Sequence, residues 1–216
     1  MQLVIVSDTH GQHRKLGRLR GDVLIHCGDI AMGSPRHDGG IAALDAWFAE
    51  QDFRLILCIG GNHDFALQRV GRGARRVFRH AHYLEDESYE FEGVKFHCAP
   101  WVPELQGWAC YREPTALARH WAGIPADTDV HITHTPPRGI LDRNSGGREC
   151  GCAEVRAALR RVAPRVHCFG HVHAGHGVLA QDGTTFVNAA LVNRAYKIVR
   201  GAVSLELPPR RPARRH

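Results

Sequence analysis

Five short apolar runs recur along the chain, and a small polar cluster follows each of them. The runs are rich in Val, Ile and Leu, which is typical of strands buried on both faces of a sheet. Ligands of open α/β sheets bind just beyond the carboxyl ends of the strands, so we expect the clusters to share one edge. The clusters are Asp8-Thr9-His10, Gly28-Asp29, Gly60-Gly61-Asn62-His63-Asp64, Thr133-His134 and Gly170-His171-Val172-His173.

The segments between and after these runs predict helices and hairpins. Residues 88–98 alternate between apolar and polar around Gly93, as a hairpin does. Helical spacing or composition predicts helices at 11–20, 40–51, 65–70, 114–122 and 152–162. Late strands are expected at 177–180, 184–187 and 195–207, with a turn at Asp182-Gly183. This order favours an α/β fold in which two mixed, packed β-sheets are flanked by helices.

Length and charge divide the chain into a body and a tail. The 216 residues suit one domain, which we place at residues 1–207. The formal charge is +6, and the four arginines of residues 208–216 account for four of these charges. We predict that this Pro/Arg tail is disordered. A solubilising end is the favoured interpretation, and a weak phosphate or nucleic-acid tether is the alternative.

Cysteine usage and the absence of long apolar runs predict a cytoplasmic protein that does not enter a membrane. Seven cysteines are present, and several lie inside the apolar runs, where Cys behaves as a small apolar residue. The sequence shows no signal-peptide pattern and no apolar run of membrane length. Cys150-Gly151-Cys152 could be half of a zinc site, but without a second pair at zinc-finger spacing a packed pair is favoured.

The polar clusters supply the side chains that phosphate-ester hydrolysis needs. Two divalent cations can acidify a water molecule and neutralise the phosphoryl oxygens, and they require carboxylate and imidazole ligands with one bridging carboxylate. Asp8 and His10 are separated by one residue, so one turn can direct both inward. Asp29 is an isolated carboxylate that suits the bridging position. The remaining candidates are Asn62, His134, His171 and His173.

In their order and spacing, these motifs resemble those of the calcineurin-like metallophosphoesterase superfamily. The resemblance covers Asp8 to His173 and extends to Asn188. It implies a four-layer sandwich and a dinuclear metal site bridged by Asp29. The first metal would be held by Asp8, His10 and His173, and the second by Asn62, His134 and His171. His63 would not bind metal and would protonate the leaving-group oxygen.

A narrower resemblance involves the run Thr133 to Asp142, Gly151-Cys152 and Asn188-Ala189. Together these segments resemble the metallophosphodiesterase-domain subgroup, whose small enzymes are linked to cyclic-nucleotide phosphodiester hydrolysis. Some members replace the first His of Gly-His-x-His, whereas this chain keeps His171. The Ser/Thr protein phosphatases carry Gly-Asp-x-x-Asp-Arg-Gly, and the run that begins at Gly28-Asp29 does not match it.

We therefore expect a phosphoesterase that cleaves phosphodiesters, such as cyclic nucleotides, by attack of a metal-bridging hydroxide. The two divalent ions could be Mn, Fe, Zn, Co or Ni, because the mixed ligands suit all of them. The expected partner is a small phosphodiester substrate such as a nucleotide, without a stable nucleic-acid complex. The alternatives are a nuclease or phosphomonoesterase on the same metal core and a non-catalytic metal-bound regulator. The sequence leaves the oligomeric state open.

Several polar and aromatic residues have simpler interpretations. Asp8 and Asp29 could cap helices instead of binding metal, since Asp is common at that position. Among three aromatic residues of one loop, Trp101 is expected to cover the site and stack on a flat group, whereas Trp108 and Tyr111 are expected to pack. The histidines expected in the core or behind the ligands are His26, His131 and His167, and those hardest to dismiss as surface residues are His13 and His97.

Overall fold

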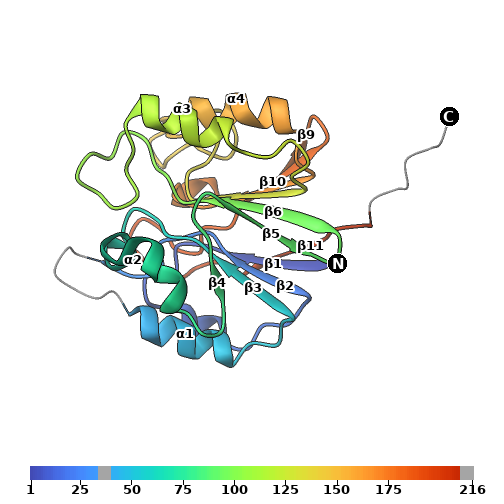
Figure 1. Ribbon diagram of the computed structural model, residues 1–216. Coiled ribbons are helices and arrows are strands. Elements are labelled where there is room, and N and C mark those ends of the chain that lie inside the picture. The colour runs from blue at the N-terminus through green and yellow to red at the C-terminus, as the bar shows by residue number, and fades with distance from the viewer. Residues whose placement is uncertain (34–39, 210–216) are drawn as a thin grey trace.

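Two β-sheets pack face to face, and helices cover the outer face of each (Figure 1). The computed structural model describes residues 1–33 and 40–209. The first sheet has five strands in the order β11 (Val203–Glu206), β1 (Gln2–Val6), β2 (Val23–His26), β3 (Leu55–Cys58) and β4 (His82–Tyr83). Strands β1 to β4 run parallel and β11 is antiparallel to β1.

The second sheet is also mixed and has six strands. Its order is β5 (Glu87–Phe91), β6 (Val94–Ala99), β7 (Val130–Thr133), β8 (Val166–Phe169), β10 (Thr184–Asn188) and β9 (Gly177–Gln181). The four central strands run parallel, and an antiparallel strand closes each side. The prediction of two mixed sheets flanked by helices is therefore confirmed.

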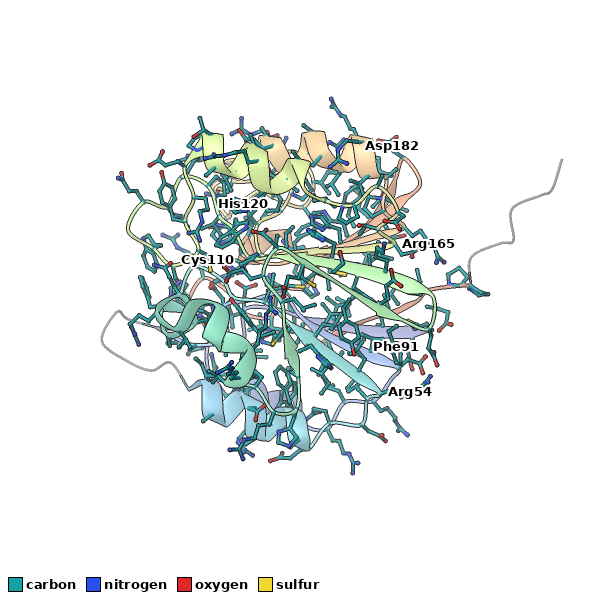
Figure 2. The ribbon with its side chains drawn as sticks, in the orientation of Figure 1. Arg54, Phe91, Cys110, His120, Arg165 and Asp182 are labelled. Atoms are coloured by element: carbon teal, nitrogen blue, oxygen red, sulfur yellow. The ribbon has the colours of Figure 1, made fainter. Side chains whose placement is uncertain are left out.

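Alternate residues of each central strand enter two different cores, which explains why the strands read as continuous apolar runs. Leu3 and Ile5 of β1 join the core between the sheets, whereas Val4 and Val6 face the helical layer. The helices α1 (Ile41–Ala49) and α2 (Phe65–Val70) cover the first sheet, and α3 (Pro114–Ala122) and α4 (Ala153–Val162) cover the second. Figure 2 shows side chains filling the space between these layers.

Four of the five predicted helices form within a few residues of their expected bounds, and the exception is the stretch 11–20. Only a short 3₁₀ helix, His13–Leu16, forms there. Gly11 and Gly17 flank it at φ values of 74° and 66°, a left-handed conformation that interrupts a longer helix. Two further 3₁₀ helices, Gly71–Arg76 and His173–Gly175, complete the helical elements of the described residues.

The predicted strand over 195–207 is wrong in its first half. Only Val203–Glu206 pairs with β1, and residues 192–198 form a loop closed by a bridge between Val192 and Ile198. The Asn193 side chain bends this loop because its Oδ1 accepts the backbone N–H groups of Ala195 and Lys197. Residues 210–216 of the predicted tail lie outside the described residues, as do His37 and His216.

Three buried histidines stack side by side on neighbouring strands of the second sheet. His97, His131 and His167 are in register on β6, β7 and β8, with ring centroids 5.7 and 5.1 Å apart. Burial lowers the pKa of His97 to about 4, that of His131 to about 3 and that of His167 well below its ordinary value. All three therefore stay neutral at pH 7, as core residues should.

This histidine stack predicts a specific dependence of stability on pH. Each ring has a lower pKa in the folded chain than in the unfolded chain, so the stability it contributes is present above about pH 6.5 and is lost as the pH falls. His131→Asn keeps a donor for the His97 carbonyl and should reduce the slope of unfolding free energy against pH by about 1.4 kcal/mol per unit near pH 5. Denaturant titrations at several pH values measure this slope, and equal slopes in both proteins would contradict the assignment.

Candidate metal centre

The loops that follow five parallel strands carry every predicted ligand. Asp8 and His10 follow β1, Asp29 follows β2, and Asn62 follows β3 in the first sheet. His134 follows β7, and His171 and His173 follow β8 in the second sheet. The carboxyl ends of the two sheets therefore meet at one site, and the structure brings all seven predicted ligands together there.

Asp8, His10 and His173 form the first group, with ligand atoms within 4.8 Å of one another. The His173 Nε2 atom lies 3.4 Å from Asp8 Oδ1. His10 Nε2 is buried and has no hydrogen-bond partner among the described residues, while Nδ1 faces the Ala31 carbonyl at 3.4 Å. A buried nitrogen without a partner is costly in a folded protein. A cation between these three side chains would satisfy it.

Asn62, His134 and His171 form the second group. His134 Nε2 and His171 Nδ1 lie 3.0 and 2.8 Å from the same atom, Asn62 Oδ1. His134 Nδ1 lies 2.8 Å from the Cys27 carbonyl, which can only accept, so in the neutral ring the proton is on Nδ1. The lone pair of His134 Nε2 then faces Asn62 Oδ1, which is also an acceptor. Such converging lone pairs fit a metal ion, and the carbonyl contact orients the ring as it does in metal-bound histidines.

Asp29 lies between the two groups and faces both. Its Oδ1 is 3.4 Å from His134 Nε2, and its Oδ2 is 3.8 Å from His10 Nε2. Oδ1 also accepts the backbone N–H of His63 at 2.8 Å, which fixes the carboxylate orientation. This position supports the predicted bridging role.

Both buried carboxylates are ionised at neutral pH. Burial raises the pKa of Asp8, but the His173 hydrogen bond and the nearby His134 outweigh it and lower that pKa to about 2. Burial likewise raises the pKa of Asp29, and His134 again reverses the shift, leaving that pKa below its usual range. Burial lowers the pKa of His134, but the attraction and hydrogen bond of Asp29, together with Asp8 and the Cys27 carbonyl, outweigh it and raise that pKa to about 9. The site is therefore an anionic pocket that favours cations.

Strained backbone geometry turns these side chains inward. Asp8, His10, Asp29 and His171 have φ values of 55°, 43°, 53° and 67°. Non-glycine residues rarely adopt this left-handed conformation, and such strain gathers at functional sites. Four of the seven predicted ligands share it, which indicates that the fold maintains their geometry at some expense in stability.

A further acidic residue, Asp64, braces the loops that carry the ligands. Its carboxylate accepts backbone N–H groups of Ile30 at 3.0 Å, Ala31 at 3.2 Å and Gly61 at 2.8 Å. It therefore joins the loop after β2 to the loop after β3. Sequence reasoning gave Asp64 no role, although its place at the end of the Gly-Asn-His-Asp motif was an available signal.

Comparison with known proteins identifies the family. The model of the calcineurin-like phosphoesterase family matches residues 1–175. The chain belongs to the calcineurin-like phosphoesterase family. Human metallophosphoesterase domain-containing protein 1 is 31% identical over 235 residues, covering 96% of this chain and 71% of that protein. A Caenorhabditis elegans UPF0046 protein is 32% identical over 223 residues, covering 96% and 76%.

A solved structure shows the same fold at lower identity. Phosphopantetheinyl hydrolase from Mycobacterium tuberculosis has a TM-score of 0.60 at 15% identity, with 90% of each chain covered. Proteins of this family use divalent metal ions, and the clusters of acidic and histidine side chains described above are where this member can hold them. No helix in the described part of this phosphoesterase is long and apolar enough to cross a membrane.

His63 stands at the edge of the cluster. Its Nε2 atom is 4.0 Å from Asp29 Oδ2, and its side chain is 13% exposed. Burial lowers the pKa of His63, and the Asp29 carboxylate opposes this effect. His63 also lies within ligand distance of His10 and Asp29, so the geometry permits metal binding as well as the acid role that the family resemblance implies.

Two predictions for the aromatic loop are wrong, the covering role of Trp101 and the packing of Trp108. Trp101 does not cover the site: it is 3% exposed, its Nε1 donates to Asp86 at 2.7 Å, and Arg112 lies 3.7 Å above its ring. Trp108 has the position expected of Trp101, with its ring 4.8 Å from that of His63 and 41% of its surface exposed. The backbone N–H of Ala109 donates to the Asn62 carbonyl and holds this loop against the ligands.

Tyr196 is the site residue that sequence reasoning missed. Its ring lies 4.8, 5.9 and 5.4 Å from those of His10, His63 and His173. The residue falls within the segment wrongly predicted to be a strand. Gln12 Nε2 donates to its carbonyl at 2.7 Å from 184 residues away, so no local pattern could have revealed the contact.

The simpler interpretations of other residues are now resolved. Neither Asp8 nor Asp29 caps a helix, and Asp8 instead accepts the N–H of His171 at 3.0 Å. Cys152 is buried in the core beside α4, and none of the candidate metal clusters found among the described residues contains a cysteine. His13 is buried against Trp47 and shares no cluster with the ligands.

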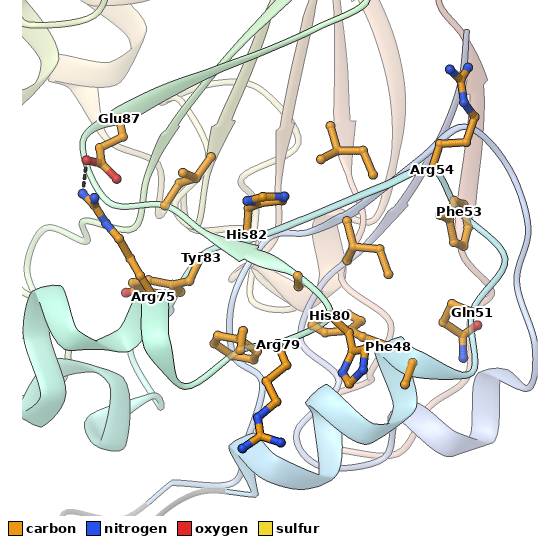
Figure 3. A pocket seen from close by; sticks show the side chains of 16 residues that line it. Phe48, Gln51, Phe53, Arg54, Arg75, Arg79, His80, His82, Tyr83 and Glu87 are labelled. Carbon is orange, nitrogen blue, oxygen red and sulfur yellow. Dashed lines mark hydrogen bonds and ion pairs between the residues drawn. The ribbon is translucent and has the colours of Figure 1, made fainter.

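A separate cavity lies away from this site. It measures about 580 Å³ and is lined by residues of α1, β3, β4 and neighbouring loops (Figure 3). Its charged groups are largely paired, since Arg75 binds Glu87 and His80 binds Asp45. None of the predicted ligands lines it.

Gly61 and Gly170 leave room for the carboxylates of Asp29 and Asp8. Replacing Gly61 provides a test of the centre. A Cβ atom on Gly61 would lie 2.4 Å from Asp29 Oδ1 and 2.7 Å from His134 Cε1. Gly61→Ala should therefore displace both side chains and weaken metal binding about 10- to 100-fold, as loss of supporting contacts does. Elemental analysis after dialysis against a metal buffer measures the effect.

Gly201→Ala is the matched control, because a Cβ there meets nothing within 4 Å. This control should retain the metal content of the unaltered protein. A Gly61→Ala protein with the same metal content as the control would show that Asp29 and His134 do not hold metal.

Proposed function

We propose that this chain is a dinuclear metal-dependent phosphodiesterase. The observation that carries the proposal is the position of Asp29 between two groups of buried imidazole, carboxylate and amide ligands. Asp8, His10 and His173 would hold one ion, and Asn62, His134 and His171 the other. When bound, two such ions supply a nucleophilic hydroxide at neutral pH and neutralise the phosphoryl oxygens. The mixed ligand set suits Mn, Fe, Zn, Co or Ni.

In this proposal, His63 holds a proton near the oxygen of the leaving group. The ring cannot swing freely, because Trp108 lies 4.8 Å from it and Tyr196 5.9 Å from it. Burial lowers the pKa of His63, and the Asp29 carboxylate, 4.0 Å from Nε2, partly offsets this effect. An alkoxide leaves poorly unless it is protonated, so a positioned acid contributes about 10²–10⁴-fold in rate.

Two recognition surfaces beside the cluster favour a diester over a monoester. One is the exposed face of Trp108 beside His63, which suits a flat leaving group. The other is a pocket of about 410 Å³ whose lining includes His171 and His173. A phosphate with two organic substituents can use both surfaces, whereas a monoester can use only one. The pocket volume suits a small molecule such as a nucleotide, and we expect no stable nucleic-acid complex.

We also propose a cytoplasmic location. All seven cysteines are free thiols, and six of them are buried. Free thiols at this density are typical of proteins kept in a reducing compartment.

Replacing His63 distinguishes metal binding by this residue from protonation of the leaving group. His63→Ala should keep the metal content of the unaltered protein, lose little activity on bis-p-nitrophenyl phosphate, and lose about 10²–10⁴-fold on a cyclic nucleotide. The reason is that p-nitrophenolate leaves readily without a proton, whereas a ribose alkoxide does not. Steady-state rates on both substrates, with elemental analysis of each protein, measure this.

His82→Ala is the control, since His82 is exposed and contacts Tyr89 far from the ligands. It should leave both rates unchanged. Equal losses on both substrates in His63→Ala would assign His63 to charge stabilisation, and loss of metal would make it a ligand.

A further inference from the structure

The pocket beside His171 and His173 has its own chemistry. Apart from these two histidines, its polar lining consists of Asn144, Ser145, Cys150, Asn193, Arg194 and Arg200. Among the described residues that line it there are two arginines and no aspartate or glutamate. An anion in the pocket would therefore meet cations and hydrogen-bond donors without a carboxylate to repel it.

Hydrogen bonds hold Arg200 in the lining of this pocket. Its Nη1 donates to the carbonyl oxygens of His173 at 2.7 Å and Val192 at 2.8 Å. These acceptors are neutral, so they orient the guanidinium without cancelling its charge. Arg194 is exposed, and among the described residues it forms no ion pair with an acidic side chain. The two side chains leave the lining with a positive charge close to the metal ligands.

Two asparagines on opposite loops add oriented donors. Asn144 Oδ1 accepts the backbone N–H groups of Gly146 at 2.9 Å and Arg148 at 3.0 Å. Asn193 Oδ1 likewise accepts from Ala195 at 2.9 Å and Lys197 at 3.1 Å. Because the oxygen of each amide is occupied by its own loop, the NH₂ group is the part left to bind a ligand.

We propose that this pocket binds a second anionic group, a phosphate or carboxylate, on the substituent that stays attached to the phosphoryl group. The inference rests on the proposed phosphodiesterase function, which places the leaving group on the other side, at His63 and Trp108. The preferred substrate class is a nucleotide-like phosphodiester that carries an additional phosphate or carboxylate. Arg194 and the two asparagine NH₂ groups then determine specificity without taking part in bond cleavage.

A matched pair of substrates tests this assignment. The p-nitrophenyl ester of thymidine 5′-phosphate and the same ester bearing a 3′-phosphate differ only in the second anion. Arg194→Gln should raise KM about tenfold more for the 3′-phosphorylated ester than for the parent ester, as the loss of one charge-assisted hydrogen bond to the second anion does. Lys197→Gln removes the same charge from the same loop but lies outside the pocket lining, so it should change neither KM.

Asn144→Asp provides a second variant that preserves the loop. The aspartate keeps the oxygen that accepts from Gly146 and Arg148 but replaces the NH₂ donor with a negative charge. It should weaken binding of the 3′-phosphorylated ester, relative to the parent ester, more than Arg194→Gln does.

Calorimetry provides a measure that does not depend on turnover. Thymidine 3′,5′-bisphosphate should bind the metal-loaded protein more tightly than thymidine 5′-phosphate, and the difference should shrink in Arg194→Gln and shrink further in Asn144→Asp. Equal affinities for the two nucleotides, or an effect of Lys197→Gln equal to that of Arg194→Gln, would overturn the pocket assignment. An inactive protein that still distinguishes the two nucleotides would overturn the proposed function and leave the pocket assignment standing.

Discussion

The burial of two ionised carboxylates, Asp8 and Asp29, is the constraint on which the rest of the site depends. Moving a carboxylate out of water is expensive unless cations and donors surround it. Here both side chains are almost fully inaccessible to solvent, and His134 and His173 lie within 3.4 Å of them. A protein that maintains two buried anions beside histidine side chains has an electrostatic preference for cations at this position. The divalent metal ions that proteins of the family use have the charge that this position favours.

The two-sheet architecture makes this burial achievable. Each sheet alone would expose the ends of its strands, whereas packing the sheets face to face closes the site from both sides. The loops then adopt a left-handed backbone conformation at four of the predicted ligands. Gly61 and Gly170 lie so close to Asp29 and Asp8 that a side chain at either position would clash. Asp64 fixes two of the loops through backbone N–H groups. The strain is local, and the hydrophobic layers around it supply the stability that maintains it.

The sequence alone predicted the central strands of both sheets and the candidate ligands, because both depend on short-range patterns, but it did not predict β4 and placed the start of the last strand too early. Apolar runs mark buried strands, and the polar residue that follows each run must lie at the sheet edge. The family resemblance then supplied roles that spacing could not. Trp108 was expected to pack, and Tyr196 was missed, for the same physical reason. Their loops have no periodicity, and long-range contacts such as Ala109 with Asn62 and Gln12 with Tyr196 position them. The exposure of Trp101 could not be judged without knowing that Asp86 and Arg112 enclose it.

The most direct test of the account is the electron paramagnetic resonance spectrum of the protein titrated with Mn(II). If Asp29 bridges two ions, the spectrum at saturation will show an exchange-coupled pair, and elemental analysis will give two manganese ions per chain. A single ion per chain with the hyperfine pattern of isolated Mn(II) would contradict the dinuclear centre.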